Sequence, residues 1–194
     1  FVELRDGTSE KPVQKDVKSI WVLDLHNIIA RHFHVQKNPL DVPKMVLGGI
    51  VNIIEKYRGI ESVICAADSP ELTFRHQISP EYKSNRAAKE QDYVTAKQAT
   101  YEVVGATGIP VVTVDGYEAD DIIATIVEHR GEFNAVVVSN DKDCNQLLEN
   151  GVMRFSNNEF LKQSDIVAKW GVRPEQFVDY QMLLGDSTDC VVGL

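Results

Sequence analysis

The sequence has few cysteines, no long apolar run and none of the common short catalytic motifs. Its three cysteines are scattered and lack Cys-x-x-Cys spacing, which favours a reducing, intracellular compartment over disulfides or zinc: Cys65, Cys144 and Cys190. The longest apolar runs are about half a dozen residues, too short to span a membrane, and no secretory signal is visible. Because HExxH, Walker and GxSxG motifs are missing, zinc proteolysis, Walker-type nucleotide binding and serine acylation have no support.

Acidic residues are plentiful and unevenly placed. The 194 residues are 43% hydrophobic and 25% charged, as in a soluble globular domain, but 29 Asp and Glu face only 20 Lys and Arg, which gives a net charge of −9. Nine of the acids lie in five short clusters, and the 20 that remain equal the basic residues in number. The net charge therefore belongs to the clusters and does not count against a nucleic-acid substrate.

Short apolar segments alternate with amphipathic ones. The pattern predicts strands over 19–24, 61–68, 111–114, 135–139 and 152–155, and helices over 42–58, 91–104, 118–130, 141–148, 164–170 and 174–184. This alternation is typical of an α/β fold with a mostly parallel central sheet flanked by helices. Residues 1–18 are polar without a period and are expected to form a flexible tail, with one domain over 19–194.

Most of the acid clusters follow a predicted strand or begin a predicted helix. They contain Asp24, Asp68, Glu118, Asp120, Asp121, Asp141, Asp143, Asp186 and Asp189. The carboxyl ends of parallel strands meet at one edge of a sheet, which is where α/β proteins place their sites. So many acids without matching Lys or Arg would repel one another unless hard cations bind, so the sequence predicts metal-dependent phosphodiester chemistry.

Single clusters also have structural explanations. Asp141 could cap a helix, and three acids at a helix start suit the helix dipole. Asp186 and Asp189 follow a predicted helix, where anions are not favoured, so a metal explains that pair better. A metal pair at His32 and His34 fits the pattern less well than a surface or partly buried role.

Basic and aromatic residues gather between the second predicted strand and the next helix. They are Phe74, Arg75, His76, Tyr82, Lys83 and Arg86. Lys and Arg bind phosphates, and aromatic rings stack on unpaired bases, so we expect a nucleic-acid contact here. A solvated charged loop is the simpler alternative.

Five stretches carry a family resemblance. They are FRHQISPEYKSNR (74–86), GYEADDIIATIV, VVVSNDKDCNQLL (136–148), VRPEQFVDY (172–180) and LLGDSTD (183–189). Together they resemble the 5′-nuclease domain of bacterial DNA polymerase I and the related bacteriophage 5′-3′ exonucleases, kin of flap endonucleases. The resemblance spans about residues 20 to 194.

The resemblance implies a PIN-like 5′-nuclease domain and hydrolysis of DNA at 5′ ends or 5′ flaps with two Mg²⁺ ions, for which Mn²⁺ can substitute. One ion would take Glu118, Asp120, Asp121 and Asp68, and the other Asp141, Asp143, Asp186 and Asp189, with Asp24 alongside. Lys83, Arg86 and Asp141 would be catalytic, and Arg75 and Tyr82 would help to bind nucleic acid. Residues 84–105 would form a gateway for a single strand.

The chain departs from the family pattern at three places. Leu25 and His26 follow Asp24 where the family commonly has Gly, and Cys190 follows Asp189 where it prefers Asn. The chain stops at VVGL, so the family's helix–hairpin–helix region for duplex DNA is expected to be absent. A monomer acting on DNA, and on RNA primers as a further substrate, is expected. A PIN-type ribonuclease and a catalytically silent nucleic-acid-binding module are the alternatives.

Overall fold

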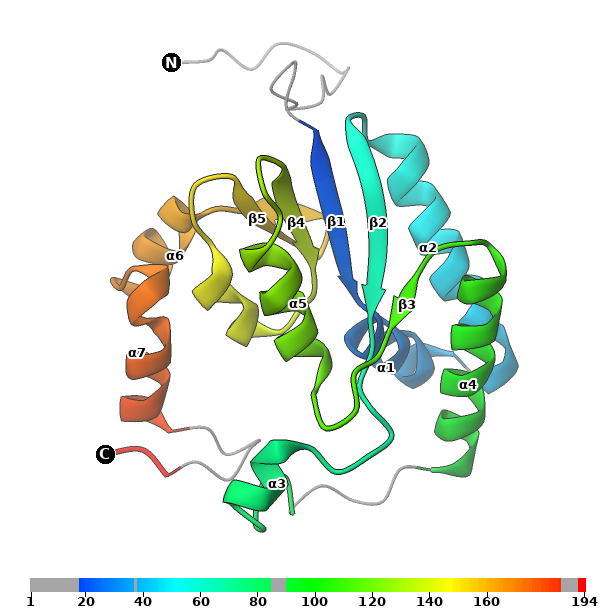
Figure 1. The fold of residues 1–194 in the computed structure, drawn as a ribbon, viewed down its shortest axis with the longest axis horizontal. Helices are drawn as coiled ribbons and strands as arrows, with labels where there is room; N and C mark the ends of the chain where they lie inside the picture. Colours follow the sequence, from blue (N-terminus) through cyan, green and yellow to red (C-terminus); the bar gives the residue numbers. More distant parts are fainter. Residues whose placement is uncertain (1–17, 37, 85–89, 186–191) are drawn as a thin grey trace.

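A six-stranded sheet forms the centre of the protein (Figure 1). The computed structural model describes residues 18–36, 38–84, 90–185 and 192–194. The strand order is β3-β2-β1-β4-β5-β6. The strands are β1 (Ser19–Asp24), β2 (Ile60–Ala66), β3 (Val111–Val112), β4 (Asn134–Val138), β5 (Val152–Ser156) and β6 (Glu159–Leu161). The first five are parallel, and β6 pairs antiparallel with β5.

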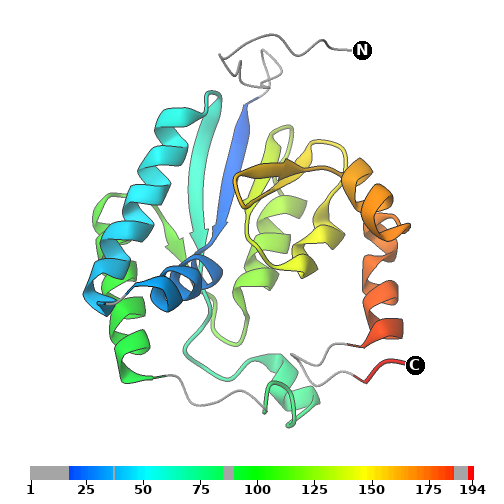
Figure 2. The same cartoon turned by 180° about the vertical axis from the view of Figure 1, so that it is seen from behind.

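Helices cover both faces of the sheet. They are α1 (Leu25–Val35), α2 (Val42–Lys56), α3 (Phe74–Ile78), α4 (Gln91–Ala106), α5 (Ala119–Glu128), α6 (Gln163–Trp170) and α7 (Phe177–Leu184), with the 3-10 turns η1 (Pro39–Asp41), η2 (Lys142–Leu147) and η3 (Pro174–Gln176). Helices α1, α2 and α4 pack on one face, and α5 and α6, with the start of α7, pack on the other. Figure 2 views the molecule from behind and shows the face that α1 and α2 cover. No helix in the described part of the chain is long and apolar enough to cross a membrane.

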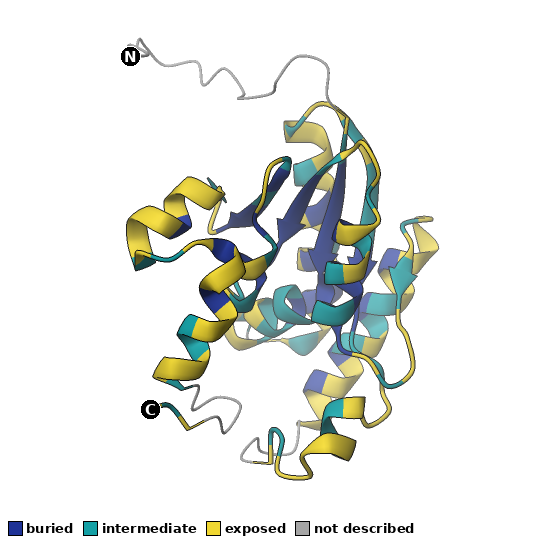
Figure 3. Ribbon diagram, turned by 60° about the vertical axis from the view of Figure 1, so that its left-hand side comes forward, coloured by how far each residue is buried: buried dark blue, intermediate teal, exposed yellow. Residues whose placement is uncertain are grey.

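Strand β1 is buried on both faces, as the sequence predicts. Trp21 and Leu23 point into the core under α1 and α2, whereas Ile20 and Val22 point into the core under α5. Strands that are buried on both sides read as continuous apolar runs. Figure 3 shows the strands as the buried centre and the outer helix faces as exposed.

The strand order fixes where a site can form. Strand β1 pairs with β2 on one side and with β4 on the other, so the order reverses at β1. In open α/β sheets, ligands bind outside the carboxyl ends of the strands at such a reversal. The described elements therefore confirm a mostly parallel α/β fold whose site edge lies beyond Asp24 and Val138.

Three elements were not predicted from the sequence. Helix α1 begins directly after β1, with no loop residue between them, and the Asp24 carboxylate accepts a hydrogen bond from Asn27 N at 2.9 Å. Helix α3 has only one full turn and a half, too short to show a period. Strand β6 follows a two-residue turn at Asn157 and Asn158, with φ of 51° and 65°, as in a type I′ hairpin.

Other expected boundaries were wrong. The segment predicted as a helix over 141–148 is the 3-10 turn η2, and the strand predicted over 111–114 forms only two ladder residues. Strand β2 ends at Ala66, so Asp68 lies in the loop beyond the strand. The tail predicted at 1–18 falls almost entirely outside the described residues.

Candidate active site

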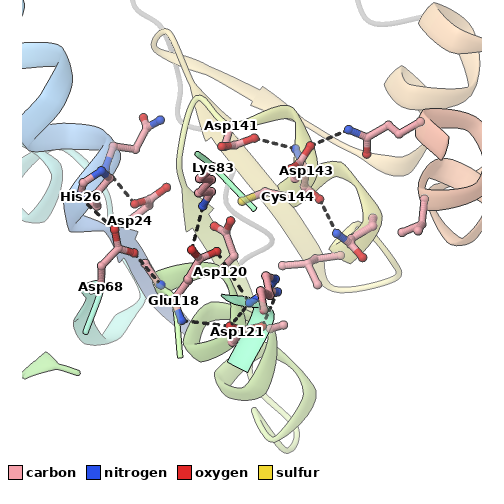
Figure 4. A pocket seen from close by; sticks show the side chains of 18 of the residues that line it. Asp24, His26, Asp68, Lys83, Glu118, Asp120, Asp121, Asp141, Asp143 and Cys144 are labelled. Atoms are coloured by element: carbon pink, nitrogen blue, oxygen red, sulfur yellow. Dashed lines mark hydrogen bonds and ion pairs between the residues drawn. The ribbon is translucent and has the colours of Figure 1, made fainter. Parts of the chain in front are cut away.

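A cleft of about 500 Å³ opens at the predicted edge of the sheet (Figure 4). Seven of the nine predicted acids line it: Asp24, Asp68, Glu118, Asp120, Asp121, Asp141 and Asp143. Arg75, Tyr82 and Lys83 line it as well. Asp186, Asp189 and Arg86 lie outside the described residues. The cleft therefore gathers acids from the ends of β1, β2 and β4 and from the start of α5.

Asp24 lies at the bottom of the cleft, only 4% exposed. Its Oδ1 accepts a hydrogen bond from Asn27 N at 2.9 Å, and its Oδ2 accepts one from Ser139 Oγ at 2.7 Å. Burial raises the pKa of Asp24 to about 6, and the negative charges of Asp68 and Asp141 add to the rise. The side chain is thus held firmly in place although its ionised form is disfavoured.

Asp68 is held by a backbone amide and by a histidine. Its Oδ1 accepts a hydrogen bond from Ala119 N at 3.0 Å, and its Oδ2 lies 3.2 Å from His26 Nδ1. The ring of Tyr93 packs edge-on against His26 with centroids 6.1 Å apart. His26, which the sequence showed only as a departure from the family pattern, thus pairs with Asp68. Tyr93 was missed because nothing local distinguishes it from a core residue of α4.

Glu118 and Asp121 begin α5 and form a reciprocal cap. Asp121 Oδ2 accepts a hydrogen bond from Glu118 N at 3.0 Å, and the Glu118 side chain caps the first turn in return. The capping explanation for this cluster is therefore correct for these two residues. It does not extend to Asp120, which lies between them.

Both capping acids also carry basic partners, and the expectation of acids without matching cations was wrong for them. Lys83 Nζ lies 2.8 Å from Glu118 Oε1, and Tyr82 Oη donates to Glu118 Oε2 at 2.9 Å. Arg75 donates to both oxygens of Asp121, at 2.7 and 2.8 Å. These partners are 35 to 46 residues apart in sequence, and at such separations the sequence spacing does not predict which side chains meet.

The Arg75 pair decides the protonation of Asp121. Burial alone would raise the pKa of this carboxyl, but the hydrogen bonds from Arg75 and from Glu118 N outweigh burial and lower it. A bidentate pair between guanidinium and carboxylate is one of the stronger charged hydrogen bonds in proteins. Asp121 is therefore ionised, and both of its carboxylate oxygens accept hydrogen bonds.

Asp120 is the exception in the cleft. Among the described residues, no hydrogen bond or ion pair reaches its carboxylate. Burial raises its pKa to about 8, and four more acids contribute to the rise: Asp24, Asp141, Asp143 and Asp68. The carboxylate thus lies where negative charge accumulates and no basic side chain compensates it.

Asp141 and Asp143 lie on the wall of the cleft that η2 forms. Asp141 Oδ1 caps this turn by accepting from Asp143 N at 2.9 Å, and its own carbonyl accepts from Arg154 Nη1 at 2.5 Å. Asp143 Oδ1 accepts from Gln181 Nε2 at 2.6 Å. Gln181 of α7 and Arg154 of β5 were missed, because their role depends on which element packs against η2.

Lys83 has an unusual backbone. Its φ is 54°, in the left-handed region that costs a side-chain-bearing residue about 1 kcal/mol or more. The side chain is only 20% exposed and points at Glu118. Backbone strain at a cleft-lining residue is common at functional sites, and here it directs the ammonium group into the cleft.

The donor set of the cleft suits a hard divalent cation. Seven carboxylates line it, and carboxylate oxygens are ligands that Mg²⁺ and Ca²⁺ prefer. Within the described residues, no three His, Cys, Asp or Glu side chains lie close enough together to hold one ion as they stand.

A family model matches most of the chain. The model is described as the N-terminal, resolvase-like domain of 5′-3′ exonucleases, and it matches residues 19–171. The chain belongs to the 5′-3′ exonuclease family. This confirms the resemblance seen in the acid and basic motifs of the sequence.

Curated members of the family are similar over most of this chain. A 5′-3′ exonuclease of Buchnera aphidicola from Schizaphis graminum is 34% identical over 192 residues, covering 96% of this chain and 67% of that protein. Its counterpart from Acyrthosiphon pisum is 35% identical over 150 residues, 75% of this chain and 52% of the relative. DNA polymerase I of Helicobacter pylori is 29% identical over 190 residues, 93% of this chain but 21% of the polymerase. The chain thus spans about half to two thirds of the exonuclease relatives.

Solved structures of the family share the fold. The D15 protein of bacteriophage T5, crystallised with metal ions, superposes with a TM-score of 0.78 at 25% identity, over 91% of this chain and 69% of that one. The D15 flap endonuclease in a pseudo-enzyme–product complex with DNA and metal ions gives 0.75 at 25% identity, over 91% and 70%. These similarities confirm the α/β nuclease fold.

The metal-free exonuclease domain is expected to lose stability as pH rises from about 4 to 8. The pKa values of Asp24 and Asp120 are raised to about 6 and about 8 from the ordinary 3.8, so the folded state binds more protons than the unfolded state in this range. Each group then lowers the free energy of unfolding by up to about 1.4 kcal/mol per pH unit, less where solvent screens it.

Thermal melts in EDTA at a series of pH values test this expectation. The melting temperature should be lower at pH 8 than at pH 5, and Mg²⁺ should raise it more at pH 8. Asp115→Asn, which changes an exposed acid outside the cleft, is the matched control and should follow the parent. A melting temperature that climbs steadily over the same interval would contradict the idea.

Proposed function

We propose that this chain hydrolyses DNA phosphodiester bonds at 5′ ends and 5′ flaps, with Mg²⁺ as the cation. The observation that carries the proposal is Asp120, a carboxylate surrounded by four other acids with no basic partner in the described chain. Such a group suits the binding of a hard cation and has no role in a purely structural network. Membership of the 5′-3′ exonuclease family supplies the substrate class.

Two groups of acids would hold the cations. Asp68 and Asp120, with Glu118, would form one group, and Asp141 and Asp143 at η2 would form the other, with Asp24 beside Asp68. Asp186 and Asp189 complete the second group in the sequence-based prediction. Asp121 would act by holding Arg75, since both its oxygens are engaged. When bound, the cations would activate a water and neutralise charge on the leaving oxygen.

Lys83 would bind the phosphate under attack. Its ammonium lies inside the cleft on Glu118, and an entering phosphate would exchange with, or share, that partner. Positive charge placed beforehand near the developing negative charge stabilises the transition state without reorganisation. Arg75 would hold the acid wall in place, and Arg86 remains a predicted phosphate contact outside the described residues.

Tyr82 would contact an unpaired base. Its ring lies edge-on to His76 with centroids 5.4 Å apart, and the Lys83 ammonium lies 4.8 Å from the ring centroid. Aromatic rings beside basic side chains bind unpaired bases by stacking with little sequence preference. RNA primers as a further substrate, and action as a monomer, stay predictions.

Cleavage of a 5′-flap DNA tests the proposal. The parent protein should cut in Mg²⁺, be silent in EDTA, and release fragments with 5′-phosphates, whereas Asp141→Asn should lose about 100-fold or more in rate because one wall of the cation site loses its charge. Asp179→Asn, which changes an acid on α7 that does not line the cleft, should cut like the parent.

The same assay separates the alternatives. Faster cutting of single-stranded RNA than of flapped DNA would favour the PIN-type ribonuclease. DNA binding without Mg²⁺-dependent turnover would favour the silent binding module. Equal cleavage by the parent and Asp141→Asn would remove the nuclease assignment.

A further inference from the structure

A second pocket of about 200 Å³ lies on the α1–α2 face of the sheet. Its walls come from α1, α2, the end of β4 and the turn between β5 and β6. Asn27 lines both this pocket and the catalytic cleft, and its Oδ1 accepts a hydrogen bond from Asn140 N at 3.2 Å. The two cavities are therefore neighbours that share Asn27, whereas the other residues that line them differ.

The lining of the second pocket is basic. Arg31, His32 and Lys56 contribute to it, and no Asp or Glu does among the described residues, in a chain of net charge −9. In the described part of the chain, no ion pair or side-chain hydrogen bond engages Arg31 or His32. Burial lowers the pKa of His32, and the charge of Arg31 adds to the effect. The positive charge of Arg31 and Lys56, without acids beside it, favours an anionic ligand.

Amide side chains provide further polar groups. Asn52 of α2 and the turn residues Asn157 and Asn158 line the pocket, and within the described chain none has a side-chain hydrogen bond. Each amide offers two donors and one acceptor, which is the complement of a nucleobase edge. The hairpin fixes the backbone of the turn, so the positions from which Asn157 and Asn158 extend are preorganised.

The inner wall is apolar and partly aromatic. Val46, Ile50 and Ile53 of α2 face the pocket together with Tyr57 and Phe155, whose rings lie 5.7 Å apart. A wall of this kind takes a flat, weakly polar ring, and the basic rim takes a charge. A nucleotide combines both properties.

Gly49 leaves the pocket open. It lines the pocket from α2, and a Cβ added there would meet no atom within 4 Å. Its neighbour Gly48 has equally free space but does not line the pocket. Glycine costs an interior helix position up to about 1 kcal/mol relative to alanine, so the helix itself does not require Gly49.

We propose that this pocket binds a nucleoside monophosphate unit, with the phosphate on Arg31 and Lys56 and the base against the apolar wall and the turn amides. The unit can come from a free mononucleotide or from the terminal nucleotide of a DNA strand. The proposal does not rest on catalysis, because binding is measured without metal.

Equilibrium binding in EDTA tests the proposal with two probes, dAMP and a short single-stranded oligo(dA). The parent should bind at least one of them saturably, Gly49→Met should weaken that binding about tenfold or more by filling the pocket, and Arg31→Gln should weaken it as well. Gly48→Met is the matched control and should bind like the parent. Thermal melts should show both glycine variants folded, at or above the parent's melting temperature.

The outcomes divide clearly. A loss with Gly49→Met for dAMP supports a free mononucleotide as the source, and a loss for oligo(dA) alone supports a strand end. Binding that Gly49→Met leaves unchanged would place the nucleotide in the catalytic cleft and overturn the proposal. So would an equal loss in Gly48→Met, or no saturable binding at about millimolar concentration of either probe.

Discussion

Asp120→Asn is expected to abolish Mg²⁺-dependent cleavage while making the metal-free protein more stable. The carboxylate has a pKa of about 8 because burial and four neighbouring acids disfavour its charge. Between about pH 4 and 8 the unfolded state therefore releases a proton that the folded state keeps, which costs folding free energy. A neutral amide of the same shape removes that cost, and a gain of about 1–2 kcal/mol at pH 8 is expected. The rate should fall by about 100-fold or more because a cation ligand is lost.

Asp121→Asn is the matched control, one position away. Here the acid is already stabilised by Arg75, so the amide would break a bidentate pair and leave the guanidinium with one ionic partner fewer. The expected result is a lower melting temperature in EDTA, the opposite of Asp120→Asn. If Asp120→Asn melted below the parent in EDTA at pH 8, the electrostatic account of the cleft would be wrong.

Lys83→Ala is expected to reduce flap cleavage by about 100-fold and to destabilise the fold by about 1–3 kcal/mol. The rate falls because the cleft loses the positive charge proposed to bind the scissile phosphate. The stability falls because Glu118, 8% exposed, keeps its charge without the ammonium that lies 2.8 Å away. Single-turnover rates and melting curves measure the two effects separately.

Two further variants separate charge from position. Lys83→Arg keeps the charge and should recover part of the stability more readily than the rate, since the scissile phosphate requires a particular reach. Lys44→Ala removes an exposed lysine on α2, outside the cleft, and should change neither. Full activity in Lys83→Ala would exclude Lys83 from phosphate binding.

The sequence predicted the site edge because the relevant information is local. Asp24 and Asp141 follow apolar runs directly, and parallel strands bring such positions together without any knowledge of side-chain contacts. The partners of Glu118 and Asp121 could not be predicted in this way. Arg75 and Lys83 reach them from α3 and the turn that follows it, which lie below the start of α5 in Figure 1, and only the folded path of this segment decides the pairing.

The secondary-structure predictions were likewise correct where the signal was local and repeated along the element. Long periodic segments such as α2 and α5 were predicted correctly, since a buried stripe repeats several times along each of them. Helix α1 was missed because it follows β1 without an intervening turn, and β6 because it has only three residues. The type I′ turn at Asn157 and Asn158 was the available signal for that hairpin.

The two outer strands of the sheet have a bearing on how the protein behaves at high concentration. At the edges, β3 has two residues and β6 has three, so the described sheet offers few free backbone groups to another chain. Short edge strands are one means by which β-sheet proteins resist edge-to-edge aggregation. Charge-neutralising substitutions in the cleft, which reduce the repulsion between molecules, should therefore leave the protein free of amyloid-like assembly.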